Sequence, residues 1–341
     1  MLCIFCLQER ASSLEHVYPL AIGGTVTTDR VCQECNSTLG TRVDAALSDF
    51  LPIRARRAEL RLAGNSGTPP AWYEIFLGDA TVIGQNANRI QTTFDEATGK
   101  LDHRQLYHAT DVVTADGRKQ RRITIDARDK DQIPKIIQRE RKRHGLAPLS
   151  DEELKAAAGD FETKEVKNPV VQLSIGASFA FLRHAMIKIA YELAFLWLGE
   201  AYLKDPIANA LRIAILDPDV ASTDRIDAYV DVADGCTAFK QFWIPHKEHH
   251  LAYSFLLADG GIAINVRVFD IYAASLVVSR EPSRYIASAA DRAKLRFLSI
   301  DAVTGRTIDT SFDEESRRLA MAMRTYGRGN PLPDALSDNA V

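Results

Sequence analysis

The sequence is poor in cysteine and has no excess of charge of either sign. Its 341 residues include only 5 cysteines, which excludes a scaffold held together by disulfides. The 42 Lys and Arg residues and the 45 Asp and Glu residues give a formal net charge of -3. That balance excludes the overall positive field of a protein that coats nucleic acid without specificity, although it leaves room for a local basic groove.

The sequence also lacks an export signal and an uncharged membrane span. Its first residues do not combine a charged region, an apolar region and a small-residue cleavage site, so we expect a cytoplasmic protein. The most apolar stretch, residues 177–203, contains Arg183, Lys188 and Glu192, which would be unfavourable in a bilayer. We therefore predict a long buried helix there and no membrane contact. Because its apolar surface exceeds what a small domain needs, we also hypothesise a homodimer.

Four of the five cysteines form two Cys-x-x-Cys pairs near the start of the chain. The stretch "MLCIFC" contains Cys3 and Cys6, and "VCQECN" contains Cys32 and Cys35. Without an export signal, such pairs indicate a metal site rather than disulfides. Four thiolates suit a structural Zn²⁺. The alternative is a redox dithiol, which would need only one pair in a thioredoxin-like context that is absent here.

Three residues near these pairs are candidates for chemistry. Glu15 and His16 are adjacent, so on a strand their side chains point to opposite faces. Asn36 follows Cys35 on the first turn of a helix that we predict from Cys32 onward. Zinc would tie that helix to the segment leading into Glu15, so Glu15 and Asn36 could share a hard cation such as Mg²⁺. His16 would lie close by, able to take a proton.

The whole pattern resembles the HNH endonuclease superfamily with its ββα-metal fold. The matching stretches are "EHVYPLAIGG" and "VCQECNSTLGTRVD", which place Cys-x-x-Cys-Asn after Glu-His-x-x-Pro and Gly-Gly. The resemblance implies that His16 is the general base and that Glu15 and Asn36 ligate a catalytic Mg²⁺ or Mn²⁺. It implies an endonuclease that cuts nucleic acid, with DNA as the expected substrate. A defence or restriction role is expected only by analogy.

The sequence departs from the family pattern at two positions. Many members carry an asparagine in the second strand that orients the histidine, but "TVTTDRVC" has none. Thr28, Asp29 or a backbone carbonyl are the remaining candidates for orienting His16. Many members also carry a lysine where Gly40 stands, and Arg42 is a substitute for contacting phosphate. Asp44 is either a support for the site or part of a surface salt bridge.

The rest of the chain predicts an α+β protein in four segments. Residues 1–65 form the zinc-stapled module, 66–172 a β-rich segment with a basic helix, 173–327 an α+β domain of unknown role, and 328–341 a disordered tail. We expect strands across 71–126, including "AWYEIFLG", and a capped helix from Ser150 with Glu153 at its third position. The helix that begins at Cys32 should end at Pro52.

Further basic and histidine-rich runs have two interpretations each. Residues 54–57, 118–122 and 139–144 are locally basic, so they either contact phosphate or form solvated charged faces. "PHKEHH", with His246, His249 and His250, is either a second metal site or, in the favoured interpretation, an exposed turn.

Two other functions compete with a nuclease. A zinc module that binds nucleic acid without catalysis would not bring Glu15, His16 and Asn36 together. A zinc domain that binds only proteins would have no basic surface near the zinc.

Overall fold

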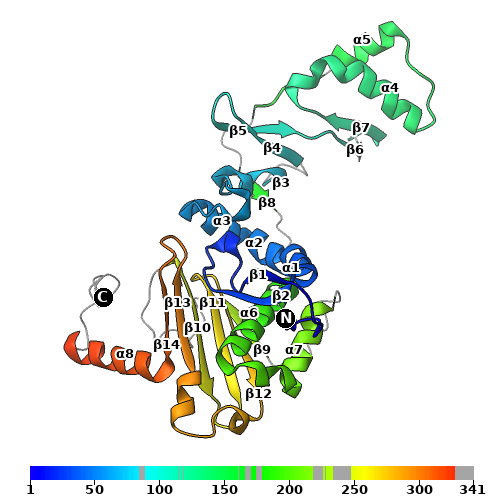
Figure 1. The fold of residues 1–341 in the computed structure, drawn as a ribbon. Coiled ribbons are helices and arrows are strands. Elements are labelled where there is room, and N and C mark those ends of the chain that lie inside the picture. The colour runs from blue at the N-terminus through cyan, green and yellow to red at the C-terminus, as the bar shows by residue number, and fades with distance from the viewer. Residues whose placement is uncertain are drawn as a thin grey trace. The chain divides into compact units, whose positions relative to one another are not determined.

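The computed structural model describes residues 1–83, 89–113, 115–117, 119–159, 161–165, 170–173, 179–217, 226, 228–232 and 247–326. The predicted tail, 328–341, and two residues of the predicted runs, Arg118 and His246, lie outside these residues. The α+β fold class is confirmed, because helices and antiparallel sheets both occur along the chain. The chain forms two compact units, one made of Met1–Trp72 with Ala177–Val341 and the other of Tyr73–Gly176 (Figure 1).

The N-terminal module has the predicted hairpin followed by a helix. Its strands pair antiparallel, with Glu15 opposite Thr28 and His16 opposite Thr27. A π-helical turn, Gly40–Asp44, interrupts the predicted helix. The elements are β1 (Ser12–His16), β2 (Thr27–Cys32), α1 (Gln33–Leu39), α2 (Ala45–Asp49) and α3 (Leu51–Leu60).

Pro52 was predicted to end this run of helix, and that prediction is wrong in detail. The helix stops earlier, at Asp49, because Phe50 has an extended ψ of 125°. Pro52 then lies in the first turn of α3, where proline is well tolerated because the first amides of a helix have no intrahelical partner. The basic run 54–57 therefore lies on a helix, and it faces the rest of its own unit.

The remainder of the first unit is a six-stranded antiparallel sheet with helices on it. The strand order is β14-β13-β10-β11-β12-β9. Helices α6 and α7 contact β12, and α8 contacts β10, β13 and β14. The elements are α6 (Phe179–Leu198), α7 (Pro206–Leu216), β9 (Ala228–Val232), β10 (His249–Leu256), β11 (Ile262–Val268), β12 (Tyr272–Ser279), β13 (Arg296–Asp301), β14 (Thr307–Ser311) and α8 (Phe312–Tyr326).

The module and this sheet share one hydrophobic core. The predicted buried helix is confirmed as α6, whose apolar side chains lie in the same cluster as Phe5 and Val17 of the module. The Tyr191 hydroxyl on α6 donates to the Ile4 carbonyl at 2.5 Å, and the Tyr18 hydroxyl donates to the Leu251 carbonyl at 3.0 Å. The apolar surface that suggested a homodimer is thus used within the chain, and the homodimer stays a prediction.

The Gly23-Gly24 pair lies in close contact with two backbone segments, one next to β13 of the sheet and one within the module. Gly23 has a φ of 85°, which residues with a side chain rarely adopt, and a Cβ there would lie 2.5 Å from the Ala302 carbonyl oxygen. A Cβ on Gly24 would lie 1.9 Å from the Tyr18 carbonyl oxygen. Glycine is therefore required at both positions by close backbone contacts.

Within its described residues, the second unit holds two small sheets and two α-helices. A four-stranded sheet has the order β5-β4-β3-β8, and β6 pairs with β7. The predicted cap is confirmed, because the Glu153 amide donates to Ser150 Oγ at 3.3 Å and the Ser150 amide to Glu153 Oε2 at 2.8 Å. The elements are β3 (Gly78–Val82), β4 (Arg89–Asp95), β5 (Lys100–Gln105), β6 (His108–Val113), β7 (Lys119–Thr124), α4 (Ile133–Arg143), α5 (Asp151–Gly159) and β8 (Val171–Leu173).

The predicted strand in "AWYEIFLG" is wrong. Residues Trp72–Phe76 form a 3-10 turn instead, and the Tyr73 ring stacks on Phe94 with the ring centroids 3.6 Å apart. Aromatic residues fit a strand or a packed turn equally well, so packing decided between them. Among the described residues, no helix combines the length and the apolar character that crossing a membrane requires.

Candidate metal centres and the His16 strand

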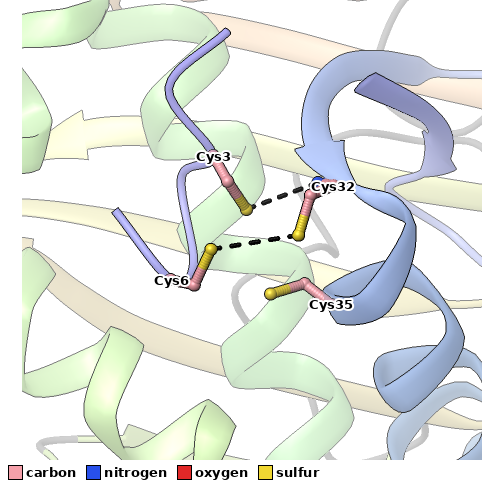
Figure 2. A group of neighbouring side chains, drawn as sticks. All are labelled: Cys3, Cys6, Cys32 and Cys35. Atoms are coloured by element: carbon pink, nitrogen blue, oxygen red, sulfur yellow. Dashed lines mark hydrogen bonds between the residues drawn. The ribbon is translucent and has the colours of Figure 1, made fainter. Parts of the chain in front are cut away.

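The four predicted zinc ligands come together in the module. The sulfur atoms of Cys3, Cys6, Cys32 and Cys35 all lie within 4.8 Å of one another (Figure 2). The Cys6 and Cys32 sulfurs are 3.9 Å apart, and Zn–S bonds of about 2.3 Å in a tetrahedron place sulfurs about 3.8 Å apart. The Cys32 amide donates to the Cys3 sulfur at 3.4 Å, which helps to orient that ligand. The cluster fits a structural Zn²⁺.

The strand β1 presents Glu15 and His16 to different surroundings. Glu15 faces inward and is 2% exposed, whereas His16 is half-buried and Leu14 is exposed. This alternation is what the pleat of a strand predicts for adjacent residues. The side chains of Leu14 and His16 therefore share the outer face, and the Glu15 carboxylate lies in the interior.

Asn36 is tied to the same strand from α1. Its side-chain nitrogen donates to the Leu14 carbonyl at 2.8 Å and to Ser13 Oγ at 2.9 Å. Both hydrogen bonds use Nδ2, so the amide oxygen, which is the atom that a cation binds, is not used in either. The structure thus brings Asn36 to the residues just before Glu15 and His16.

The Glu15 carboxylate meets a lysine that the sequence analysis did not assign to the site. The fully buried Lys188 ammonium, on α6, forms an ion pair with Glu15 Oε1. It lies 3.1 Å from both carboxylate oxygens of Asp44 and 3.6 Å from Glu192 Oε2. It also donates a hydrogen bond to the His16 carbonyl at 2.9 Å. We call Lys188, Glu15, Asp44 and Glu192 the Lys188 cluster.

One signal for Lys188 was present in the sequence. Lys188 and Glu192 are four residues apart on a helix that is otherwise strongly apolar, and a charge in such a helix must find a partner. The sequence cannot show which distant residues supply the other partners. Asp44, for which two roles stayed open, contacts Lys188.

Burial dominates the protonation of these groups. Burial raises the pKa of Glu15, Asp44 and Glu192, although the Lys188 charge opposes each shift. Burial alone would lower the pKa of Lys188, but Asp44, Glu192 and Glu15 raise it, so Lys188 stays protonated. Burial and the Lys188 charge both lower the pKa of His16. His16 is therefore neutral at pH 7, which is the form that accepts a proton.

The two candidates for orienting His16 through a side chain are not supported. The Thr28 hydroxyl accepts a hydrogen bond from the Arg30 amide at 3.2 Å, and Asp29 is exposed. A backbone carbonyl that orients the His16 ring, the third candidate, stays a prediction. A different contact is observed at His16, where the backbone carbonyl of His16 itself accepts a hydrogen bond. Its donor is Lys188.

Two arginines of the basic run 54–57, Arg56 and Arg57, make contacts within their own unit. The Arg57 guanidinium is buried and donates to the carbonyls of Ala21 at 2.7 Å and Ser48 at 3.2 Å. Arg56 forms an ion pair with Asp270 at 2.9 Å. These two arginines hold α3 against its own unit and are not the phosphate contacts considered above.

The histidine-rich run is not an exposed turn at His250, so that interpretation is wrong there. His250 is fully buried on β10 and its ring stacks on Tyr18 at 4.9 Å. Its Nε2 donates to the Ile22 carbonyl at 2.8 Å, and its Nδ1 accepts from the Phe269 amide at 3.3 Å. Both ring nitrogens are used, so His250 is not a metal ligand. Burial lowers its pKa to about 4.

The comparisons with known proteins concern the N-terminal module. A family model described as HNH endonuclease matches residues 3–51. No curated protein and no solved structure matches the chain significantly. The match spans the four cysteines, Glu15, His16, Asn36 and the turn before α3. Over residues 3–51 the chain therefore carries the HNH endonuclease pattern, and the resemblance drawn from its Cys, Glu-His and Cys-Asn motifs is confirmed for this module.

Proposed function

We propose that the chain is a metal-dependent endonuclease that hydrolyses phosphodiester bonds, with DNA as its substrate. The observation that carries the proposal is that Asn36, on α1, bonds to the strand that ends in His16, within the residues that the family model matches. His16 is half-buried and neutral, and Asn36 holds the strand just before it. A defence or restriction role is part of the proposal and rests on analogy alone.

Each residue has a distinct role in this proposal. His16 takes a proton from the attacking water, and its lowered pKa keeps the imidazole ready at pH 7. The Asn36 amide oxygen and the Glu15 carboxylate would hold Mg²⁺ or Mn²⁺. When bound, that cation neutralises charge on the scissile phosphate and the leaving oxygen. The zinc cluster fixes α1, and with it Asn36, against the N-terminal segment.

A basic face in the second unit supports a nucleic-acid substrate. Lys135, Arg139 and Lys142 are exposed and follow the spacing of one face of α4. The Arg139 guanidinium lies over the Tyr107 ring at 5.0 Å, which holds one of these charges in place. Such a row of cations suits phosphate contacts without base readout.

One observation favours the alternative of a zinc module that binds nucleic acid without cutting it. Glu15 is 2% exposed and paired with Lys188, so part of its carboxylate is already used. This alternative predicts DNA binding that Mg²⁺ and Mn²⁺ do not change.

Cleavage of a labelled DNA duplex by the full chain separates the two functions. With Zn²⁺ bound and Mn²⁺ added, we expect cutting that His16→Ala reduces by about 100-fold or more, in line with general-base catalysis. His103→Ala, on β5, is the matched control and should cut like the wild type. Binding without cutting by all three proteins would leave the non-catalytic function. Equal cutting by His16→Ala and the wild type would remove His16 as the base.

A further inference from the structure

The Lys188 cluster contains more carboxyl groups than its one ammonium group needs as partners. Glu15, Asp44 and Glu192 surround Lys188, and both Glu192 oxygens lack a hydrogen-bond partner among the described residues. Removing charges from water is unfavourable, and a merely structural pair would need one carboxylate. The arrangement therefore calls for an explanation beyond holding α6 in place.

The contacts of Lys188 converge on the strand that carries His16. Lys188 donates hydrogen bonds to the His16 carbonyl and to both carboxylate oxygens of Asp44, and it forms an ion pair with Glu15. The ion pair is formed with Oε1 of Glu15, and Oε2 is the oxygen that a cation would take. Asp44 approaches with both oxygens and so fixes the ammonium from the module side.

We propose that Lys188 is a positioning residue of the proposed nuclease site. From α6 it holds one oxygen of the Glu15 carboxylate and the carbonyl of His16, so that the other Glu15 oxygen and the imidazole take fixed places. The proposal rests on the proposed function of His16 and Glu15. A residue that bonds to a metal-ligating carboxylate orients that carboxylate. Losing such a residue typically weakens metal binding by about 10-fold to 100-fold.

The consequence is that the first 60 residues do not complete the site alone. Lys188 lies 172 residues after His16, on the central helix of the shared core. The C-terminal half of the chain thus contributes a functional side chain to the module, besides covering it.

Mn²⁺ binding to the full zinc-loaded chain, measured from the signal of free Mn²⁺ in electron paramagnetic resonance, tests the proposal apart from activity. We expect Lys188→Met to weaken Mn²⁺ binding by about 10-fold to 100-fold and to slow DNA cleavage. Because Lys188→Met leaves buried carboxylates without a counter-charge, a second variant combines it with Asp44→Asn. The double variant should regain stability but not Mn²⁺ affinity.

His184→Leu is the matched control on the same helix. His184 is buried, and its ring bonds to the Ile215 carbonyl at 2.8 Å and not to a residue of the Lys188 cluster. It should lower the melting temperature without changing Mn²⁺ affinity. A double variant that binds Mn²⁺ and cuts DNA like the wild type would overturn the role of Lys188 and leave the nuclease proposal standing. A wild-type chain that neither binds Mn²⁺ nor cuts would remove both.

Discussion

The cysteine cluster and the Lys188 cluster hold the same module by opposite means. Each gathers four ionisable side chains, the first from two parts of the chain and the second from three. The cysteine cluster offers four sulfurs within 4.8 Å and has no cation of its own, so it needs a metal ion. The Lys188 cluster supplies its cation from α6. A metal site can therefore be read from local spacing, whereas an internal cation depends on the whole fold.

The two clusters also differ in what losing the cation leaves behind. Without zinc, the thiols can take up protons, and the small segment around them loses its link. Without Lys188, Asp44 and Glu15 remain in the shared core, where water cannot reach them easily. The first loss should unfold the module, and the second should destabilise the whole first unit.

Removing zinc should have the largest effect. Cys35→Ser takes one of four thiolates away, and structural zinc contributes about 10 kcal/mol or more to the folding of small zinc modules. We expect zinc content to fall below one ion per chain and DNA cleavage to reach background. Zinc content by mass spectrometry and cleavage by gel check this. Re-addition of Zn²⁺, but not Mg²⁺, should restore a wild-type chain stripped by a chelator, and restoration by Mg²⁺ alone would contradict a structural zinc.

Removing Lys188 should have the second-largest effect. Lys188→Met should lower the free energy of unfolding by about 3–5 kcal/mol, because removing one partner of a buried ion pair leaves the other uncompensated. Denaturant unfolding measures this. Glu192→Gln should do the opposite or nothing, since burial raises the pKa of that carboxyl and its charge is unfavourable at pH 7. Equal destabilisation by both variants would mean that Lys188 is not the centre of the cluster.

His250 contrasts with Lys188, because it is a buried titratable group that stays uncharged. Its pKa falls from 6.5 to about 4 on folding, because it is buried, and the charges of Arg267 and of His249 when protonated add to the shift. The unfolded chain therefore takes up a proton first as the pH falls. Stability should drop between about pH 6.5 and pH 4, by about 3 kcal/mol at most. His250→Gln should flatten this slope in denaturant unfolding, and an unchanged slope would contradict the assignment.

The smallest effect should come from the basic face of α4. Lys142→Ala removes one exposed charge, so DNA affinity should fall several-fold and the dependence of log affinity on log salt should decrease by about one. Fluorescence anisotropy across a salt series measures both. Lys155→Ala, on α5, is the matched control. The same change for both variants would mean that total charge matters and not this face.

The sequence was sufficient where the determining contacts are local. The capping of α5 depends on Ser150 and Glu153, three positions apart, and the two Cys-x-x-Cys pairs and the ββα order lie within one short segment of the chain. The partner of Glu15 lies at Lys188, and the partner of Tyr18 lies at Leu251, so neither could be found without the fold. The four predicted segments stay a prediction, while the structure places residues 1–72 and 177–341 in one unit.

Chemical rescue of His16 would test the central claim most directly. His16→Gly leaves a space beside β1 and removes the proposed base, so Mn²⁺-dependent cleavage by the zinc-loaded full chain should fall to background. Added imidazole should restore cleavage in proportion to its neutral fraction, and the same imidazole should not accelerate the wild type. If His16→Gly cuts DNA as fast as the wild type at equal zinc content, His16 is not the base and the account of this site is wrong.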